Sequence, residues 1–196
     1  MSGPRDAPTL AELASHVGYE LELMAHAASN LAQATPDSID ATLALEAMLV
    51  HARCLIDFLG LRADEIREND DLWHRDFTRH WDSATARSEF WKTRDEINKR
   101  LAHLTWRRAR TDNSWQFGDL TQRILRAFRR FVIVLEADID SDPEALTALR
   151  RALAQAARIA PRRLDVTGAV QSATTSSTIG VISISDFSGY RRPAGS

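Results

Sequence analysis

The chain contains a single cysteine, Cys54, among its 196 residues. One cysteine excludes an internal disulfide and a metal site built from a cysteine cluster. No apolar run approaches the roughly 18 residues of a membrane-spanning helix, so we expect no contact with a membrane. A lone cysteine on an apolar segment is typical of a reducing compartment, and we therefore expect a cytoplasmic protein in which Cys54 is buried.

Other absences restrict the possible chemistry. Residues 1–13 contain no basic region followed by an apolar stretch, so we expect no secretion signal. No glycine-rich phosphate loop is present, and no glutamate is followed by histidine at the Glu-x-x-His spacing of di-metal bundles. The sequence therefore predicts no metal and no other cofactor. The remaining metal alternatives are a pair four residues apart, either Glu22 and His26 or His16 and Glu20, and a single site formed by His26, His51 and His103.

The charge is unevenly distributed, although the net charge is only −2. Residues 1–99 carry 18 acidic and 10 basic residues, whereas residues 100–163 carry 13 arginines and 7 acidic residues. Arginine suits carboxylates and phosphates, so a basic face for RNA or for an acidic partner is one interpretation. We favour the other, in which the acidic half packs against the basic half within one fold.

Apolar residues recur with helical spacing almost throughout the chain. A capping box of Thr9 and Glu12 begins the first helix, and Asp142-Pro143 begins the last. The last helix is rich in alanine and arginine, and we expect it to lie on the surface. Helices are expected over about residues 10–34, 39–59, 72–82, 83–108, 115–137 and 143–159.

These elements predict an all-α fold, an antiparallel bundle of four main helices with a shorter C-terminal helix. We assign residues 1–160 to this single domain. From residue 161 the composition shifts to serine, threonine and glycine, so we expect residues 161–196 to form a disordered tail.

Several polar residues interrupt these apolar helices. Arg53 and Asp57 are four residues apart on the side opposite their helix's apolar stripe, the spacing of a solvated helical ion pair. Arg94 aligns with the apolar stripe of its own helix, and because a buried arginine needs a carboxylate partner, we expect one in the acidic half. Asn98 flanks the same stripe. We take Arg53, Asp57, Asn98 and Arg107 as candidate binding residues.

The histidine and tryptophan residues allow two interpretations. His51 lies at the flank of an apolar stripe, where a structural boundary histidine is commoner than a ligand. The five tryptophans could stack on bases, but filling the junctions between helices is the commoner role and the one we expect. They are Trp73, Trp81, Trp91, Trp106 and Trp115.

The order of several segments resembles an uncharacterised family of bacterial all-helical proteins over about residues 40–135. This resemblance implies a fold more than a function. The segments are HARCLIDFLG, then LWHRDF and Trp81, then INKRLAHLTWRRAR, and then Trp115.

More distantly, the chain is similar to HEPN domains, small helical bundles that are often ribonucleases of toxin–antitoxin and phage-defence systems and are usually dimers. Their motif is an arginine followed, after four to six residues, by a histidine. Arg75 and His80 match it with four residues between them, and Arg67 and His74 match it with six, whereas Arg94 and His103 have eight between them and depart from it. The resemblance implies that Arg75, His80, Arg94 and His103 are the candidate catalytic groups, which would position a phosphate and protonate its leaving oxygen.

Taken together, the sequence predicts a non-catalytic helical protein that binds a protein partner or forms a homodimer. The alternative is a metal-independent, HEPN-like ribonuclease or toxin acting on RNA. A second alternative is a metal or small-molecule site inside the bundle.

Overall fold

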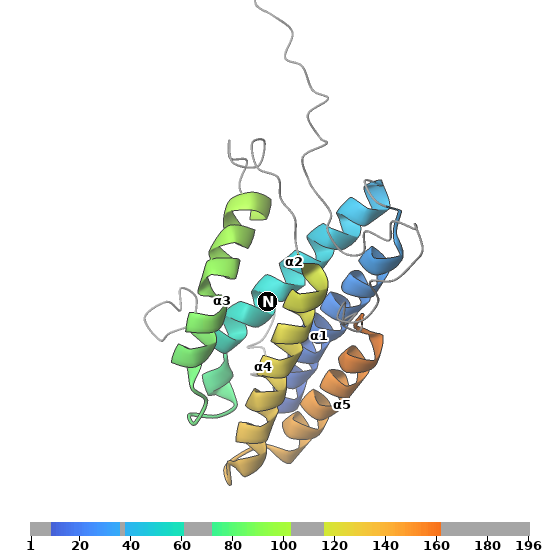
Figure 1. Ribbon diagram of the computed structural model, residues 1–196. Helices are drawn as coiled ribbons and strands as arrows, with labels where there is room; N and C mark the ends of the chain where they lie inside the picture. Colours follow the sequence, from blue (N-terminus) through green and yellow to red (C-terminus); the bar gives the residue numbers. More distant parts are fainter. Residues whose placement is uncertain (1–8, 36–37, 61–71, 103–115, 162–196) are drawn as a thin grey trace, which may run out of the picture.

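The computed structural model describes residues 9–35, 38–60, 72–102 and 116–161, and all regular elements within them are helical (Figure 1). The all-α bundle predicted from the sequence is therefore confirmed. The five helices are α1 (Leu10–Gln33), α2 (Ile39–Gly60), α3 (Ser83–Ile97), α4 (Phe117–Ala137) and α5 (Pro143–Ile159). The short elements are a 3-10 turn at His74–Asp76 and a π-helical turn at Asn98–Ala102.

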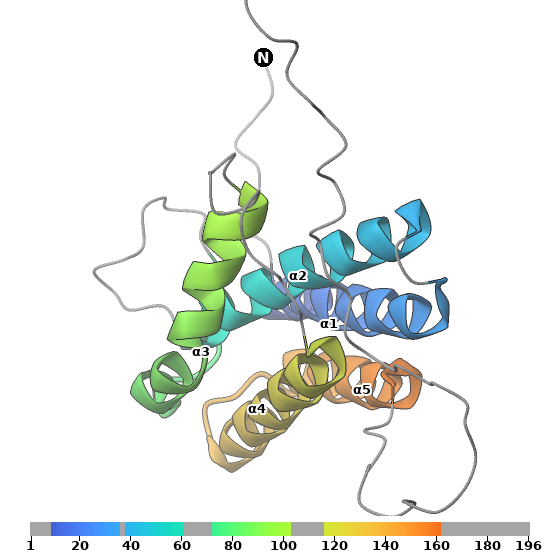
Figure 2. The same cartoon turned by 45° about the horizontal axis from the view of Figure 1, so that its top comes forward.

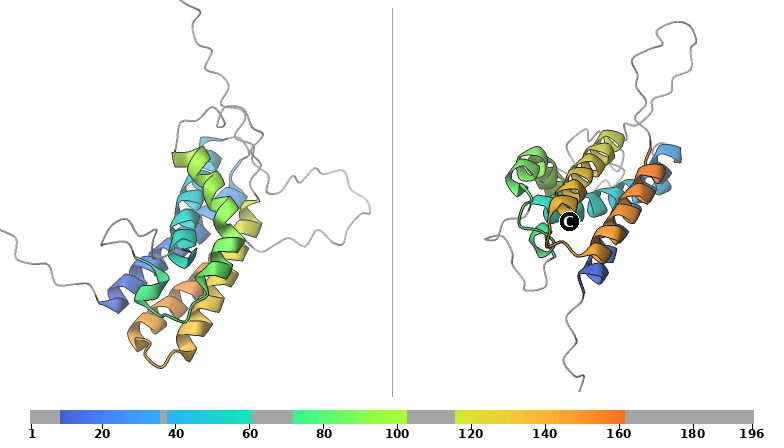
Figure 3. Two further views of the ribbon diagram at one scale, coloured as in Figure 1. Left: turned by 90° about the vertical axis from the view of Figure 1, so that its left-hand side faces the viewer. Right: turned by 90° about the horizontal axis from the view of Figure 1, so that it is seen from below.

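The helices form two antiparallel pairs that stack on each other. Figure 2 shows α1 beside α2 in one layer and α4 beside α5 in the other. Extensive packing between α1 and α5 joins the two layers, and α3 lies against α2 at one side of the bundle (Figure 3). Among the described residues, no helix combines the length and apolarity that crossing a membrane requires.

Local capping interactions define where the helices begin. The Thr9 amide donates to Glu12 Oε2 over 2.7 Å and the Glu12 amide donates to Thr9 Oγ1 over 3.2 Å, which confirms the predicted capping box. Asp142 accepts hydrogen bonds from two amides in the first turn of α5, and Pro143 occupies the first turn as predicted. Ser38 Oγ accepts from an amide in the first turn of α2.

Aromatic rings fill the core between α2, α4 and the segment before α3. The Phe58 ring stacks on Phe128 with centroids 5.6 Å apart and meets Phe131 edge-on at 5.3 Å. Trp81 packs edge-on against Phe131 at 5.5 Å. Its Nε1 also donates to the carbonyl oxygen of Leu59 over 2.8 Å, which satisfies an acceptor at the C-terminal end of α2.

The helix predicted over residues 72–82 is wrong, because this segment contains only the three-residue turn at His74–Asp76. Its aromatic residues enter the core individually: Phe77 is buried, and Trp81 is held by its hydrogen bond to α2. The helix predicted over 83–108 is α-helical to Ile97 and continues as a π-helical turn to Ala102. Residues 103–108 lie outside the described residues.

The expectation that the last helix lies on the surface is wrong in part, because one face of α5 is buried against α1 although its other face is exposed. Small residues make this close approach possible: Gly18 of α1 faces Ala152 of α5, and a Cβ atom on Gly18 would lie 2.8 Å from the Ala152 Cβ. Alanine contributes little to an apolar pattern, and so the buried face of α5 was not recognised. That face comprises Ala145, Leu149, Ala152, Leu153 and Ala156.

Candidate functional site

An exposed apolar stripe runs along α2 on the side turned away from the core. We call it the outer α2 stripe. Ile39 is 70% exposed, Leu43 59% and Val50 49%. With a rise of 1.5 Å per residue, the stripe extends over roughly 22 Å, or about four turns. Its residues are Ile39, Leu43, Ala47, Val50 and Cys54, all of them exposed.

The opposite side of α2 is apolar as well and forms part of the core. The core side includes Leu45, Met48, Leu55 and Leu59, each nearly inaccessible to solvent. A helix that is apolar on all sides is normally buried on all sides. The sequence pattern identified the core stripe but missed the outer α2 stripe. The scarcity of charged residues between Ile39 and Val50 is the signal that could have revealed it.

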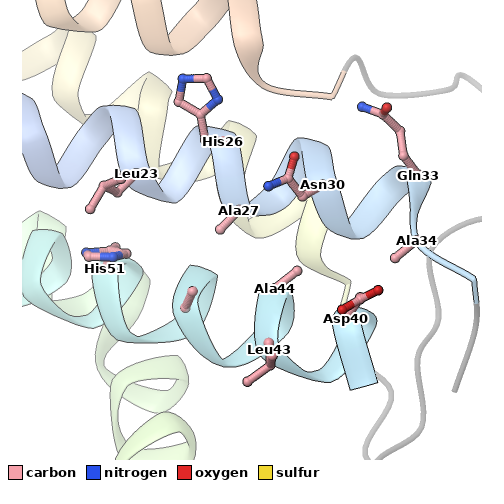
Figure 4. Close-up of a pocket in the computed structure, with 11 residues that line it drawn as sticks. Leu23, His26, Ala27, Asn30, Gln33, Ala34, Asp40, Leu43, Ala44 and His51 are labelled. Atoms are coloured by element: carbon pink, nitrogen blue, oxygen red, sulfur yellow. The ribbon is translucent and has the colours of Figure 1, made fainter. Parts of the chain in front are cut away.

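A groove lies beside the outer α2 stripe, between α1 and α2 (Figure 4). Its volume is about 610 Å³. Ala27 and Ala44 lie between the two helices, Leu23 and Leu43 stand at its sides, and Asp40 lies at the end of α2. The groove exists because these alanines do not fill the space between the helix axes, and it can admit a large apolar side chain.

Acidic residues outnumber basic residues on the two helices that form the groove. The described residues of α1 and α2 include six acidic residues and one basic residue, Arg53. Asp40 is exposed beside the groove. The six acidic residues are Glu12, Glu20, Glu22, Asp40, Glu46 and Asp57.

His51 joins α2 to α1 at the edge of the groove. Its Nδ1 lies 2.8 Å from Glu20 Oε2, and the Tyr19 ring meets the imidazole edge-on with centroids 6.3 Å apart. The structural role predicted for His51 at the flank of the apolar stripe is therefore confirmed by its carboxylate partner.

Asp57 holds the arginine of α3. The Arg94 Nε donates to Asp57 Oδ1, and each side chain is 21% exposed. The expectation that Arg94 has a partner in the acidic half is confirmed. The expectation of a solvated pair between Arg53 and Asp57 is wrong in part, because Asp57 is largely covered and hydrogen-bonds to Arg94, while the Arg53 Nε lies 3.7 Å from it.

Trp91 lies beside this ion pair on α3 and is partly exposed. The guanidinium carbons of Arg87 and Arg94 lie 3.9 and 4.9 Å from the centroid of its ring. Cation–π contacts of this kind hold the arginines against the ring. Trp91 therefore does not fill a helix junction as predicted, whereas Trp81 does.

Cys54 is exposed, so the expectation of a buried thiol is wrong. The surrounding protein nevertheless desolvates the sulfur, and with the nearby carboxylates of Glu20 and Asp57 this raises the pKa of the Cys54 thiol to about 11. A thiol with such a pKa is almost entirely protonated near neutral pH, and it is a poor nucleophile there.

The segment before α3 carries His80 and Arg75. The His80 ring is 73% exposed, and its Nε2 lies 4.0 Å from Asp138 Oδ2. The Thr78 hydroxyl donates a hydrogen bond to the same carboxylate, and this hydrogen bond is the main cause of the lowered Asp138 pKa. Arg75 stands over the Trp73 ring at 5.5 Å, beside a hollow of about 410 Å³ lined also by Asp76 and Arg79.

The remaining candidates of the sequence lie at or beyond the end of α3. Asn98 begins the π-helical turn, and its Oδ1 is buried and has no hydrogen-bond partner within the described parts of the chain. His103 and Arg107 lie outside the described residues. No hydrogen bond or ion pair joins Arg94 to His80.

The described part of the chain contains no group of three or more His, Cys, Asp or Glu side chains arranged to hold a metal ion. His26 and His51 both line the groove, but Figure 4 shows the His26 ring directed away from α2.

The acidic and basic halves of the sequence meet at Glu89 of α3. Arg130 Nη2 lies 2.6 Å from Glu89 Oε2, and Arg123 donates to the Glu89 carbonyl oxygen over 2.8 Å. Packing of one half against the other therefore explains these two arginines. Arg126 and Arg129, by contrast, are exposed on α4.

Comparisons of the chain with protein-family models, with curated proteins and with solved structures returned no match.

Proposed function

We propose that this chain is a non-catalytic binding module and that the outer α2 stripe, together with the adjoining groove, is its binding surface. The observation that carries the proposal is the continuity of Ile39, Leu43, Ala47 and Val50 on the exposed side of a helix whose other side is already in the core. A contiguous exposed apolar surface of this kind is typical of an interaction site.

The chemistry of the neighbouring polar groups supports a binding role over a catalytic one. Arg94 is occupied by Asp57, and His51 by Glu20. Cys54 is protonated near neutral pH because its pKa is raised. These groups stabilise the packing of α1, α2 and α3, and none of them forms a nucleophile–base pair of the kind that catalysis requires.

The proposal is tested through Cys54, the single thiol of the chain, which lies at one end of the stripe. The rate at which a membrane-permeant maleimide alkylates Cys54 is measured in the cells that produce the protein and in a dilute solution of the purified protein. A partner that occupies about 90% of the chain slows the reaction in cells about tenfold, by mass action. The control is a Cys54→Ser, Ile133→Cys chain, whose thiol lies on the exposed face of α4, outside the stripe.

Leu43→Glu should return the in-cell rate of Cys54 to that of the purified protein, because it places a charge in the stripe without touching the core. Equal protection of Cys54 and of the control thiol, or no protection of either, contradicts a binding role for this surface.

The HEPN-like ribonuclease is the second candidate, and the exposed His80 beside Asp138, on the same segment as Arg75, is what favours it. In that case His80→Ala abolishes RNA cleavage by the purified chain while its thermal unfolding remains unchanged. Cleavage that survives both His80→Ala and His103→Ala eliminates this candidate.

A further inference from the structure

We propose that the occupant of the outer α2 stripe is an amphipathic helix of a partner protein that carries lysine or arginine along the flank of its apolar face that faces the groove. Its apolar face lies on the stripe, and one bulky side chain enters the groove between α1 and α2. This inference rests on the proposed function, because it names the partner of the same surface.

The shape of the surface fits a helix. The stripe is straight and about four turns long, which matches the apolar positions i, i+4 and i+7 that a docked helix presents. The groove of about 610 Å³ is lined by Leu43 and Ala47 of the stripe, so a leucine or phenylalanine of the partner can enter it beside these residues.

The charge of the surface selects a basic flank. The described residues of α1 and α2 carry six carboxylates against the single Arg53. Asp40 lies at the groove, and the Glu20 carboxylate lies at its other end beside His51. Basic side chains on the flank of the partner that faces the groove would lie near these two carboxylates, whereas acidic side chains there would be repelled.

The same charges disfavour a second copy of this chain as the occupant. An antiparallel two-fold arrangement of α2 on α2 brings the same flank of each helix together, as in any isologous interface. Glu46 of one copy would then lie near Glu46 of the other, and like charges at a rim oppose association. A homodimer through this surface is therefore a result that would overturn the proposal.

The test uses three synthetic peptides of about five helical turns, a length that supports helix formation. Two of the peptides share one apolar seam of leucines, and they carry either lysine or glutamate beside this seam. The third peptide has the composition of the lysine peptide in a scrambled order. Each is labelled with fluorescein and titrated with the full-length chain, and binding is followed by anisotropy at low and high salt.

The lysine-flanked peptide should bind about tenfold tighter than the glutamate-flanked peptide at low salt, and the difference should shrink as salt screens the charges. The scrambled peptide should not bind, because its apolar residues no longer lie on one face. Ala47→Phe should fill the groove and abolish binding. Asp40→Lys should reduce the preference for lysine flanks about two- to fivefold, and Ile133→Glu on α4 should change nothing.

Equal binding of the lysine and glutamate peptides, or stripe-dependent dimers in sedimentation of the purified chain, overturns the inference about the partner. If no peptide binds while Cys54 is protected in cells, the partner chemistry is wrong and the proposed function stands. If Cys54 is unprotected in cells, the proposed function fails, and the inference about its occupant fails with it.

Discussion

Replacement of Gly18 by alanine should destabilise this protein, although alanine is the better helix former. Gly18 lies in the interior of α1 and faces Ala152 of α5. An alanine Cβ there would lie 2.8 Å from the Cβ of Ala152, a separation that real Cβ atoms essentially never show. The obstructing atom belongs to a short, rigid side chain, so the two helices must move apart.

The expected effect combines two opposing contributions. Alanine in place of glycine favours a helix interior by about 1 kcal/mol. An additional carbon in a closely packed interface typically reduces stability by about 1–3 kcal/mol. Because the contact here is between two helix surfaces with no flexible side chain to rearrange, we expect the clash to outweigh the gain in helix propensity and the free energy of unfolding to fall by up to about 2 kcal/mol. The melting temperature should then fall by up to about 8 °C.

The assay is urea denaturation followed by circular dichroism at the helical band, with Gly118→Ala as the matched control. Gly118 lies in the first turn of α4, and a Cβ added there meets no atom within 4 Å. Gly118→Ala should therefore stabilise the protein by up to about 1 kcal/mol. The compensating change Ala152→Gly, made in the Gly18→Ala chain, should recover part of the lost stability because it removes the obstructing atom.

Two results would refute this reasoning. If Gly18→Ala stabilises the chain as much as Gly118→Ala does, α1 and α5 are not in close contact at this position. If Ala152→Gly destabilises the Gly18→Ala chain as much as it destabilises the wild type, the two positions are not coupled.

Three further predictions concern charged and polar groups. Asp57→Ala leaves Arg94 without its carboxylate partner and should reduce the free energy of unfolding by about 1–3 kcal/mol. A double-mutant cycle of Asp57→Ala and Arg94→Ala, measured by urea denaturation, should show that the two residues are coupled. If the effects of the two substitutions simply add, the ion pair between them is excluded. The Asp138 pKa lies below its ordinary value of 3.8, chiefly because the Thr78 hydroxyl donates a hydrogen bond to the carboxylate. The ionised carboxylate therefore stabilises the fold at pH values above 3.8, and this stabilisation is lost as the pH falls through the lowered pKa of the folded state. Thr78→Val should raise the Asp138 pKa in a carboxyl NMR titration, and an unchanged value would exclude this hydrogen bond. Alkylation of Cys54 should continue to accelerate up to about pH 11, and a plateau near its ordinary pKa of 9.0 would contradict the raised value.

The features that were predicted correctly from sequence depend on residues close together in the chain. The capping box at Thr9 and the Asp142-Pro143 start of α5 involve residues no more than three positions apart, so their geometry follows from local chemistry. The long helices with a strong apolar period, α1 and α4, were also found within a few residues of their ends.

The features that were missed depend on contacts between distant segments. Trp81 and Phe77 have helical spacing, yet Trp81 is held by the Leu59 carbonyl oxygen, 22 residues earlier. The burial of α5 depends on Gly18, more than a hundred residues away, which admits Ala152. No pattern within either segment contains this information.

The candidate site was predicted only in part for the same reason. The requirement of Arg94 for a carboxylate followed from its position on an apolar stripe, but the identity of that carboxylate, Asp57, depends on how α3 packs on α2. The outer α2 stripe was missed because periodicity reveals a buried face only by contrast with a polar one, and between Ile39 and Val50 that contrast is weak.

The outward face of α4 shows why the apolar character of the outer α2 stripe needs an explanation beyond folding. On α4, the exposed Ile133 is surrounded by exposed Arg126, Arg129 and Arg130, as expected for a face in contact with water. On α2, the exposed positions of four consecutive turns carry apolar residues and, at the edge, Asp40. An exposed leucine or valine adds no hydrophobic stabilisation to the isolated bundle, because that stabilisation arises only when apolar surface is removed from water. The two faces belong to the same fold, and the stability of the isolated bundle does not require the apolar residues on the outer side of α2. This difference between the two faces is the physical reason for our proposal that the binding surface lies on α2.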